Sequence, residues 1–151
     1  MKLLKKVVST FLSSLAFVGV CHADLAGWST DLDAALEKAK IEKKSVLVEF
    51  TGSDWCPPCI AMRKNVFSKK EFVDAASKHF ILVELDFPKK DKALAKKNQP
   101  WAKKFEIEGY PTVILLDHEG KEFNRFFASE HPTTEKFLAH LTAALEKKDL
   151  D

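Results

Sequence analysis

The segment Cys56-Pro57-Pro58-Cys59 constrains this chain more than any other feature of its sequence. It follows soon after the apolar run 45–50, which predicts a strand buried on both faces, and its two prolines suit the first turn of a helix. The sequence therefore predicts a strand-to-helix junction with two thiols at the start of the helix. Exposed N–H groups at that end stabilise a thiolate on the leading sulfur. Two thiols at this spacing can close a small disulfide ring and reopen it, which indicates redox chemistry.

The first 23 residues have the layout of a secretory signal peptide. Three lysines and no acid lie within the first six residues, and the apolar stretch 7–20 that follows is short for a membrane span. Small residues then occupy the −3 and −1 positions of a cleavage site that ends at Ala23. We therefore expect export and cleavage after Ala23. An uncleaved N-terminal anchor and a lipid anchor on Cys21 are the alternatives.

Loss of residues 1–23 would change the charge of the protein. The full chain has 24 basic and 22 acidic residues and a net charge of +2; without the three lysines of the leader, 21 basic residues face 22 acids and the net charge is −1. The basic character belongs to the leader, so we expect no nucleic-acid partner. Residues 24–151 suffice for one domain with a core.

Cysteine usage in residues 24–151 narrows the chemistry further. Cys56 and Cys59 are the only cysteines there, and a pair so close together is not a disulfide-stapled scaffold. A structural zinc site usually needs four ligands, and the histidines of this segment show no ligand spacing. We therefore expect no metal and assign the pair to electron exchange.

Apolar periodicity and turn residues predict alternating helices and strands. Helices are expected over 32–41 with Thr30 and Asp33 as a capping pair, from Cys56 to about 66, over 69–78, over 89–104 with an interruption before Pro100, and after Thr133 or Thr134. Strands are expected over 45–50, 80–85, 112–116 and 121–127, the last two as a hairpin. This order predicts an α/β sandwich around a mixed sheet.

Two motifs within this element order resemble the thioredoxin family, over most of residues 30–147. They are Trp-Cys-Pro-Pro-Cys at 55–59 and Gly-Tyr-Pro-Thr at 109–112, ahead of the hairpin. Residues 51–55 are similar to the corresponding part of exported thioredoxin-like proteins and of the soluble thiol domains of membrane electron carriers. The resemblance implies a thioredoxin fold, with a mixed central β-sheet flanked by helices on both faces, and a redox-active disulfide in place of any cofactor.

The resemblance also implies roles for individual residues. Cys56 is the exposed nucleophile that attacks a substrate disulfide, and the more buried Cys59 resolves the mixed disulfide. Pro111 matches the family's cis-proline, which lies against the cysteine pair, and the backbone of Tyr110 can pair with an extended substrate. The alternatives are a permanent structural disulfide and an ordinary trans proline.

Glu49 matches a buried carboxylate that in this family moves protons to and from the resolving thiol. Burial would raise its pKa, which suits proton transfer near neutral pH. The sequence departs from the family pattern because this acid is Glu and because the loop after the strand is one residue longer. The alternative is an exposed glutamate at a strand edge.

The remaining candidate residues surround the cysteines. Trp55 is expected to pack beside the site and shield it. Pro57 and Pro58 supply no charge that would stabilise the reduced thiolate, which favours a reducing or mild potential. The predicted substrate-binding residues are Trp55, Pro57, Pro58, Tyr110 and Pro111.

The sequence therefore predicts an exported thiol:disulfide oxidoreductase that reduces or isomerises disulfides in extracytoplasmic proteins. It would be soluble after cleavage, and a membrane thiol electron carrier would recharge it. The alternatives are a disulfide-forming oxidase of the same fold and a thioredoxin-like chaperone or copper-handling module. No Met or His cluster lies near the cysteines in the sequence, which argues against copper.

Overall fold

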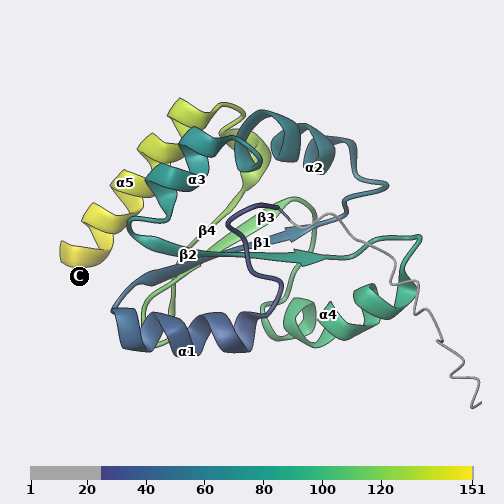
Figure 1. Ribbon diagram of the computed structural model, residues 1–151, viewed down its shortest axis with the longest axis horizontal. Helices are drawn as coiled ribbons and strands as arrows, with labels where there is room; N and C mark the ends of the chain where they lie inside the picture. Colours follow the sequence, from purple (N-terminus) through teal and green to yellow (C-terminus); the bar gives the residue numbers. More distant parts are fainter. Residues whose placement is uncertain (1–24, 151) are drawn as a thin grey trace, which may run out of the picture.

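A computed structural model describes residues 25–150, so the predicted leader and Cys21 lie outside the described residues. Helices and strands alternate in the predicted order (Figure 1). The helices are α1 (Leu32–Glu42), α2 (Pro57–Met62), α3 (Lys70–Ala76), α4 (Lys92–Lys104) and α5 (Thr134–Leu150), with a π-helix η1 (Arg63–Phe67) and a 3-10 turn η2 (Ala128–Glu130). The strands are β1 (Ser45–Thr51), β2 (Phe80–Asp86), β3 (Thr112–Leu116) and β4 (Glu122–Phe127).

The strands form one mixed sheet in the order β2-β1-β3-β4. β1 pairs in parallel with β2 and antiparallel with β3, and β3 and β4 form the predicted antiparallel hairpin. β1, β2 and β3 are buried at every residue, which explains their nearly continuous apolar sequences. The predicted mixed sheet is confirmed.

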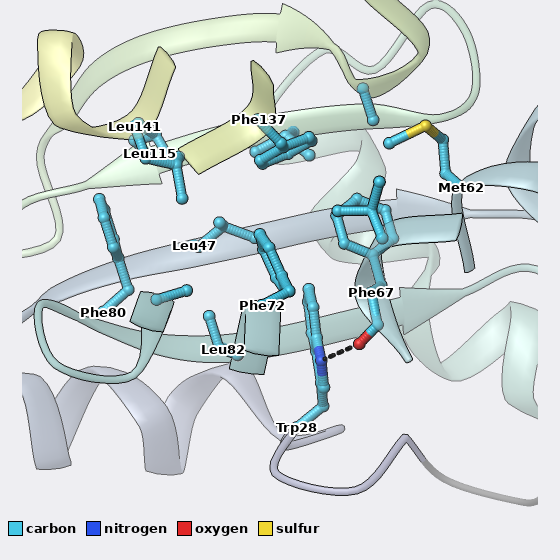
Figure 2. Packing of buried hydrophobic residues seen from close by; sticks show 14 of the residues in the cluster. Trp28, Leu47, Met62, Phe67, Phe72, Phe80, Leu82, Leu115, Phe137 and Leu141 are labelled. Atoms are coloured by element: carbon cyan, nitrogen blue, oxygen red, sulfur yellow. Dashed lines mark hydrogen bonds between the residues drawn. The ribbon is translucent and has the colours of Figure 1, made fainter. Parts of the chain in front are cut away.

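Helices cover both faces of this sheet: α1 and α4 lie on one face, and α2, α3 and α5 lie on the other (Figure 1). Each face has its own hydrophobic cluster. In the cluster below α2, α3 and α5, the ring of Phe137 packs edge-on against Phe67 at 5.2 Å and Phe72 at 5.4 Å between centroids. Trp28 closes this cluster and donates a hydrogen bond from Nε1 to the Phe67 carbonyl at 3.2 Å (Figure 2). The predicted α/β sandwich is therefore confirmed.

The start of α1 differs from the prediction. Asp31, not Thr30, is the N-cap, and its Oδ1 accepts the N–H of Ala34 at 3.0 Å. Thr30 lies one residue too early to reach this amide, because an N-cap side chain serves the second or third helical N–H.

Helix α4 also differs, since it continues through Pro100 without interruption. Asn98 donates from Nδ2 to the Asp86 carbonyl at 2.8 Å, and Ala102 is buried against the sheet. These contacts on both sides of Pro100 offset the loss of one helical hydrogen bond.

The helix predicted from Cys56 to about residue 66 divides into two parts. Pro57 and Pro58 occupy its first turn, as expected, but α-helical bonding ends at Met62. The N–H of Ser68 then reaches the carbonyl of Arg63 at 2.9 Å, five residues back, which defines the π-helix η1. The wider turn rotates the side chains after Met62 relative to those of α2.

Candidate active site

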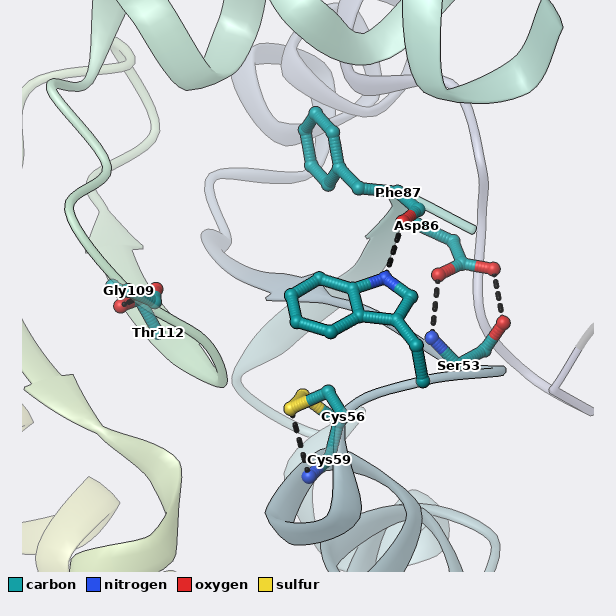
Figure 3. The surroundings of a disulfide bond; sticks show 8 residues. Ser53, Cys56, Cys59, Asp86, Phe87, Gly109 and Thr112 are labelled. Carbon is teal, nitrogen blue, oxygen red and sulfur yellow. Dashed lines mark hydrogen bonds between the residues drawn. A yellow bond between two sulfur atoms is a disulfide. The ribbon is translucent and has the colours of Figure 1, made fainter. Parts of the chain in front are cut away.

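Cys56 and Cys59 form a disulfide with an S–S distance of 2.07 Å at the start of α2 (Figure 3). Cys56 is the N-cap of this helix, and its Sγ accepts the N–H of Cys59 at 3.4 Å. The Cys56 backbone donates to the Gly52 carbonyl at 3.0 Å and accepts from the N–H of Ile60 at 3.0 Å. The leading sulfur is therefore held at the positive end of the helix, as the sequence predicts.

The prediction that Cys56 is exposed is wrong for this oxidised form. Cys56 is 3% exposed and Cys59 is 1% exposed, so both lie below the surface. The cap geometry explains this: the Cys56 side chain turns toward the first turn of α2 to bond with Cys59, instead of pointing into solvent.

Hydrogen bonds connect the loop between β1 and α2 to the C-terminal end of β2. Ser53 donates to the Asp86 carboxylate from its backbone N–H at 2.9 Å and from Oγ at 2.5 Å (Figure 3). Trp55 donates from Nε1 to the Phe87 carbonyl at 2.8 Å. These bonds hold the loop in one conformation and set the position of Trp55 directly before the cysteines.

Asp54 fastens the same loop to the chain that follows β2. Its carboxylate accepts the backbone N–H groups of Lys89 and Lys90, each at 2.9 Å. These bonds lower the pKa of Asp54, the Lys89 N–H having the largest effect. The ammonium group of Lys89 lies 4.9 Å from the ring centroid of Trp55 and adds a cation–π contact.

The predicted substrate-binding residues Trp55 and Tyr110 meet edge-on, with ring centroids 5.7 Å apart. Tyr110 also contacts Phe87 at 5.4 Å, and its partial burial raises the pKa of its hydroxyl. The Tyr110–Pro111 peptide bond is cis, as the family resemblance implies. The ring contact brings residues 109–112 beside the start of α2.

Phe127 is a surface residue of this region that sequence reasoning missed. It is an exposed aromatic side chain at the end of β4, and a Cβ on Gly109 would lie 3.2 Å from its Cε1. The next residue, Ala128, donates its N–H to the Pro111 carbonyl at 2.9 Å, which ties the end of β4 to the proline loop. The sequence did contain a signal for this residue, because Phe127 is an aromatic residue at the end of the last predicted strand.

Glu49 is buried in the middle of β1 with 1% exposure, so the alternative of an exposed strand-edge glutamate is wrong. Side chains alternate along a strand, so Glu49 shares its face with Leu47, whose cluster includes Met62 of α2. Neither carboxyl oxygen accepts a hydrogen bond of normal geometry within residues 25–150. Burial raises the pKa of Glu49 well above its usual value, and the charge of Glu84 raises it further. Its role in proton transfer stays a prediction.

Glu84 and Arg63 are charged residues of this interior that the sequence reasoning did not select. Glu84 is buried on β2, and its Oε1 forms an ion pair with Nη1 of Arg63 at 2.5 Å. Arg63 comes from η1, directly after α2. A signal was present in the sequence, because Glu84 interrupts an apolar strand in the same way as Glu49 does.

Among residues 25–150, no helix is both long and apolar enough to cross a bilayer.

Known proteins similar to this chain include two chlamydial ones. The disulfide bond reductase DsbH of Chlamydia pneumoniae is 37% identical over 94 residues, which are 60% of this chain and 57% of that protein. The thioredoxin-related protein DsbJ of the same organism is 34% identical over 128 residues, 80% of this chain and 37% of DsbJ. The chain thus spans less than two thirds of the length of either relative.

The fold agrees with a solved structure of such a protein. A solved structure of a DsbH oxidoreductase superposes with a TM-score of 0.69 at 27% identity, and the match covers 85% of this chain and 93% of that one. The thioredoxin-like family matches residues 27–118. Because this segment is more than half of the chain and contains Cys56, Cys59 and Pro111, the chain belongs to the thioredoxin-like family.

Proposed function

We propose that this protein is a thiol:disulfide oxidoreductase that reduces or isomerises disulfides in exported proteins. The observation that carries the proposal is the position of Cys56, whose Sγ caps α2 and accepts the N–H of Cys59. Once the disulfide is reduced, the same N–H and the helix terminus stabilise a thiolate on Cys56. The thiolate is the attacking species in disulfide exchange.

The reductive reaction has two exchange steps. The Cys56 thiolate attacks one sulfur of a substrate disulfide, forms a mixed disulfide and releases the other substrate sulfur as a thiolate. Cys59 then loses its proton and attacks Cys56 Sγ, which closes the Cys56–Cys59 disulfide and releases the second substrate thiolate. Two electrons pass to the substrate, so a thiol donor must reduce the protein again, and we propose a membrane thiol electron carrier for this role.

The surface around the cysteines suits protein substrates. Trp55, Pro57, Pro58 and Ile60 are exposed apolar residues that flank the pair in the chain. An apolar rim of this kind favours extended or unfolded segments that present their own apolar side chains. Tyr110 and Pro111 complete the proposed substrate contacts from the opposite loop.

The direction of electron flow is the finer part of the proposal. Pro57 and Pro58 carry no charge that would favour the reduced state, and the similar protein DsbH is named a disulfide bond reductase. We therefore expect an equilibrium potential between about −270 mV, the value of thioredoxin, and about −180 mV, the value of protein disulfide isomerase. Equilibration of the pair in glutathione buffers measures it. A potential near about −120 mV, that of the strong oxidant DsbA, would overturn the reductase assignment in favour of a disulfide-forming oxidase.

Trapping tests the catalytic role itself. Cys59→Ala removes the resolving thiol, so mixed disulfides between Cys56 and substrates should accumulate on non-reducing gels and disappear with reductant. The double variant with Cys56→Ala is the matched control and should trap nothing. If Cys59→Ala also forms no adducts with exported proteins, the enzymatic proposal is wrong, and a chaperone or binding function becomes the better explanation.

Export is proposed from the leader sequence. N-terminal sequencing of protein recovered from the extracytoplasmic fraction should begin at Asp24. Recovery of the chain with its leader intact from the cytoplasm would contradict this location.

A further inference from the structure

Two acidic residues lie side by side in the interior of the sheet. Glu49 of β1 and Glu84 of β2 are register partners in the parallel pairing of these strands. Register partners on neighbouring parallel strands project to the same face. Glu49 is 1% exposed and Glu84 is 6% exposed, so two carboxyl groups share one buried environment. Two neighbouring carboxylates cannot both ionise there without a large cost.

Arg63 supplies a positive charge to this environment. Its Nη1 lies 2.5 Å from Glu84 Oε1, and the Glu84 side chain is far more buried than that of Arg63. The backbone N–H of Arg63 bonds to the carbonyls of Cys59 and Ile60. The guanidinium that pairs with Glu84 is therefore attached to the helical turn that carries the resolving cysteine.

The surrounding groups determine which acid holds a proton. Arginine remains charged in proteins, so Glu84 has a permanently cationic partner in Arg63. Besides Glu84 and Arg63, the groups that act on Glu49 are Thr51 of its own strand and Asp86 of β2, whose carboxylate already accepts two hydrogen bonds from Ser53. Once the disulfide is reduced, Cys59 is the ionisable residue within α2, and Met62 of the same helix packs in one hydrophobic cluster with Leu47 of β1.

These groups act on Glu49 in opposite directions. Burial raises the pKa of Glu49 most, the Glu84 charge raises it next, and Asp86 adds a smaller effect of the same sign. Thr51 and Arg63 lower it but do not outweigh burial. Glu49 is therefore the member of the pair that exchanges a proton.

We propose that the Glu84–Arg63 ion pair is a positioning device that sets the proton affinity of Glu49, and through it the pH at which Cys59 is deprotonated for resolution. The proposal rests on the function proposed above. In the step concerned, the proton of the Cys59 thiol moves to the Glu49 carboxylate. The Cys59 thiolate attacks Cys56 Sγ, the Cys56–substrate bond breaks, and the released substrate thiolate or water takes the proton from Glu49.

The oxidised protein offers a direct test, because its cysteines do not titrate. Infrared difference spectra recorded across a pH series follow the C=O band of a protonated buried carboxyl, and Glu49→Gln identifies the band of Glu49. In Glu84→Gln the neighbouring negative charge is gone, so the midpoint of Glu49 should fall by about one pH unit or more. In Arg63→Gln the cation is gone, so the midpoint should rise, and Arg63→Lys should bring it back toward the wild-type value.

A surface pair provides the matched control. Glu122 accepts two hydrogen bonds from Arg125 at 2.8 and 2.9 Å on the edge strand β4, so Glu122→Gln removes an exposed arginine–glutamate pair two strands away from Glu49. The infrared midpoint of Glu49 in the Glu122→Gln variant should match that of the wild type. If Glu84→Gln moves the midpoint no further than Glu122→Gln does, the proposal is refuted. Should Glu84→Gln fail to fold, Arg63→Gln against Arg63→Lys decides the question in the same way.

A kinetic measurement tests the link to Cys59. Reduced protein is mixed with oxidised glutathione, and acid-quenched samples are analysed by mass spectrometry for the Cys56–glutathione adduct and its decay. The pH midpoint of the decay should shift downward in Glu84→Gln together with the infrared midpoint. A shift of the infrared midpoint without a shift of the decay refutes the link to resolution. If the wild-type protein does not react with oxidised glutathione, the proposed function fails, whereas the infrared comparison still decides whether Glu84 controls Glu49.

Discussion

Glu49→Gln should make the folded protein more stable as pH rises, relative to the wild type. The substitution replaces a buried carboxyl with an amide of nearly the same shape, so packing changes little. Burial is the largest cause of the raised pKa of Glu49, and it acts only in the folded state. A glutamate in the unfolded chain has a pKa of about 4.3.

The sign and slope follow from proton linkage. Between the unfolded and folded pKa values, the folded wild type binds one proton more at Glu49 than the unfolded chain does. Its stability therefore falls as pH rises, by about 1.4 kcal/mol per pH unit within this window. Below about pH 4.3 the Glu49 carboxyl is protonated in both the folded and the unfolded state, so its ionisation does not lower the free energy of unfolding. Above the folded pKa the loss of stability no longer changes with pH. Glutamine does not titrate, so the advantage of Glu49→Gln should grow through the same window.

Urea unfolding of the oxidised proteins at a series of pH values measures this difference. The slope with pH is the test, because an unpaired buried amide can add a cost that does not depend on pH. Glu119→Gln, at an exposed turn position, is the control for removing one negative charge. A stability difference between Glu49→Gln and wild type that stays flat with pH, or follows that of Glu119→Gln, would falsify the reasoning.

Three further substitutions test the packing and the loop geometry. Phe137→Ala removes a fully buried ring from the cluster below α5 and should cost about 3–5 kcal/mol in urea unfolding; a loss under about 1 kcal/mol would contradict the assigned packing. Gly52→Ala would place a Cβ 2.5 Å from Cε2 of Trp55, so the indole should move and lose its bond to the Phe87 carbonyl; an unchanged indole N–H resonance would refute this. Lys43→Gly should raise stability by about 0.5–1 kcal/mol in thermal unfolding, because Lys43 ends α1 with φ of 55°; a lower stability would argue against a strained cap.

The elements that follow from local pattern were predictable from the sequence. The apolar runs of β1, β2 and β3 allowed strand predictions within one residue of the observed bounds, because burial on both faces favours apolar residues at most positions of a strand. The helix start at Cys56 was predictable because two prolines fit only the first turn. The predicted helix interruption before Pro100 was wrong, because tertiary contacts outweighed the low helix propensity of proline. These contacts are made by its neighbours Asn98 and Ala102.

The charged cluster of Glu49, Glu84 and Arg63 could be predicted only in part. It depends on the register between β1 and β2 and on where α-helical bonding ends before Arg63. Glu49 could be selected from its place before the cysteines, but its neighbour is fixed by the alignment of β1 with β2. A shift of that register by one residue would turn Glu84 to the other face. Arg63 reaches Glu84 from the first residue of the π-helix, and no spacing rule in the sequence indicates where α-helical bonding ends.

The energetics of Glu49, Glu84 and Arg63 favour a functional role for these residues over a role in stabilising the fold. A buried ion pair is weak support for stability, because desolvation of both charges offsets most of their attraction, and apolar residues of similar volume often serve as well or better. Glu49 costs stability outright at neutral pH, since no hydrogen bond of normal geometry from residues 25–150 compensates its burial. Leucine at position 49 would suit the flanking apolar residues of β1 and would remove that cost. The cost of a buried glutamate in β1 is therefore consistent with the proposed role of Glu49, which is to accept the proton of the Cys59 thiol during resolution.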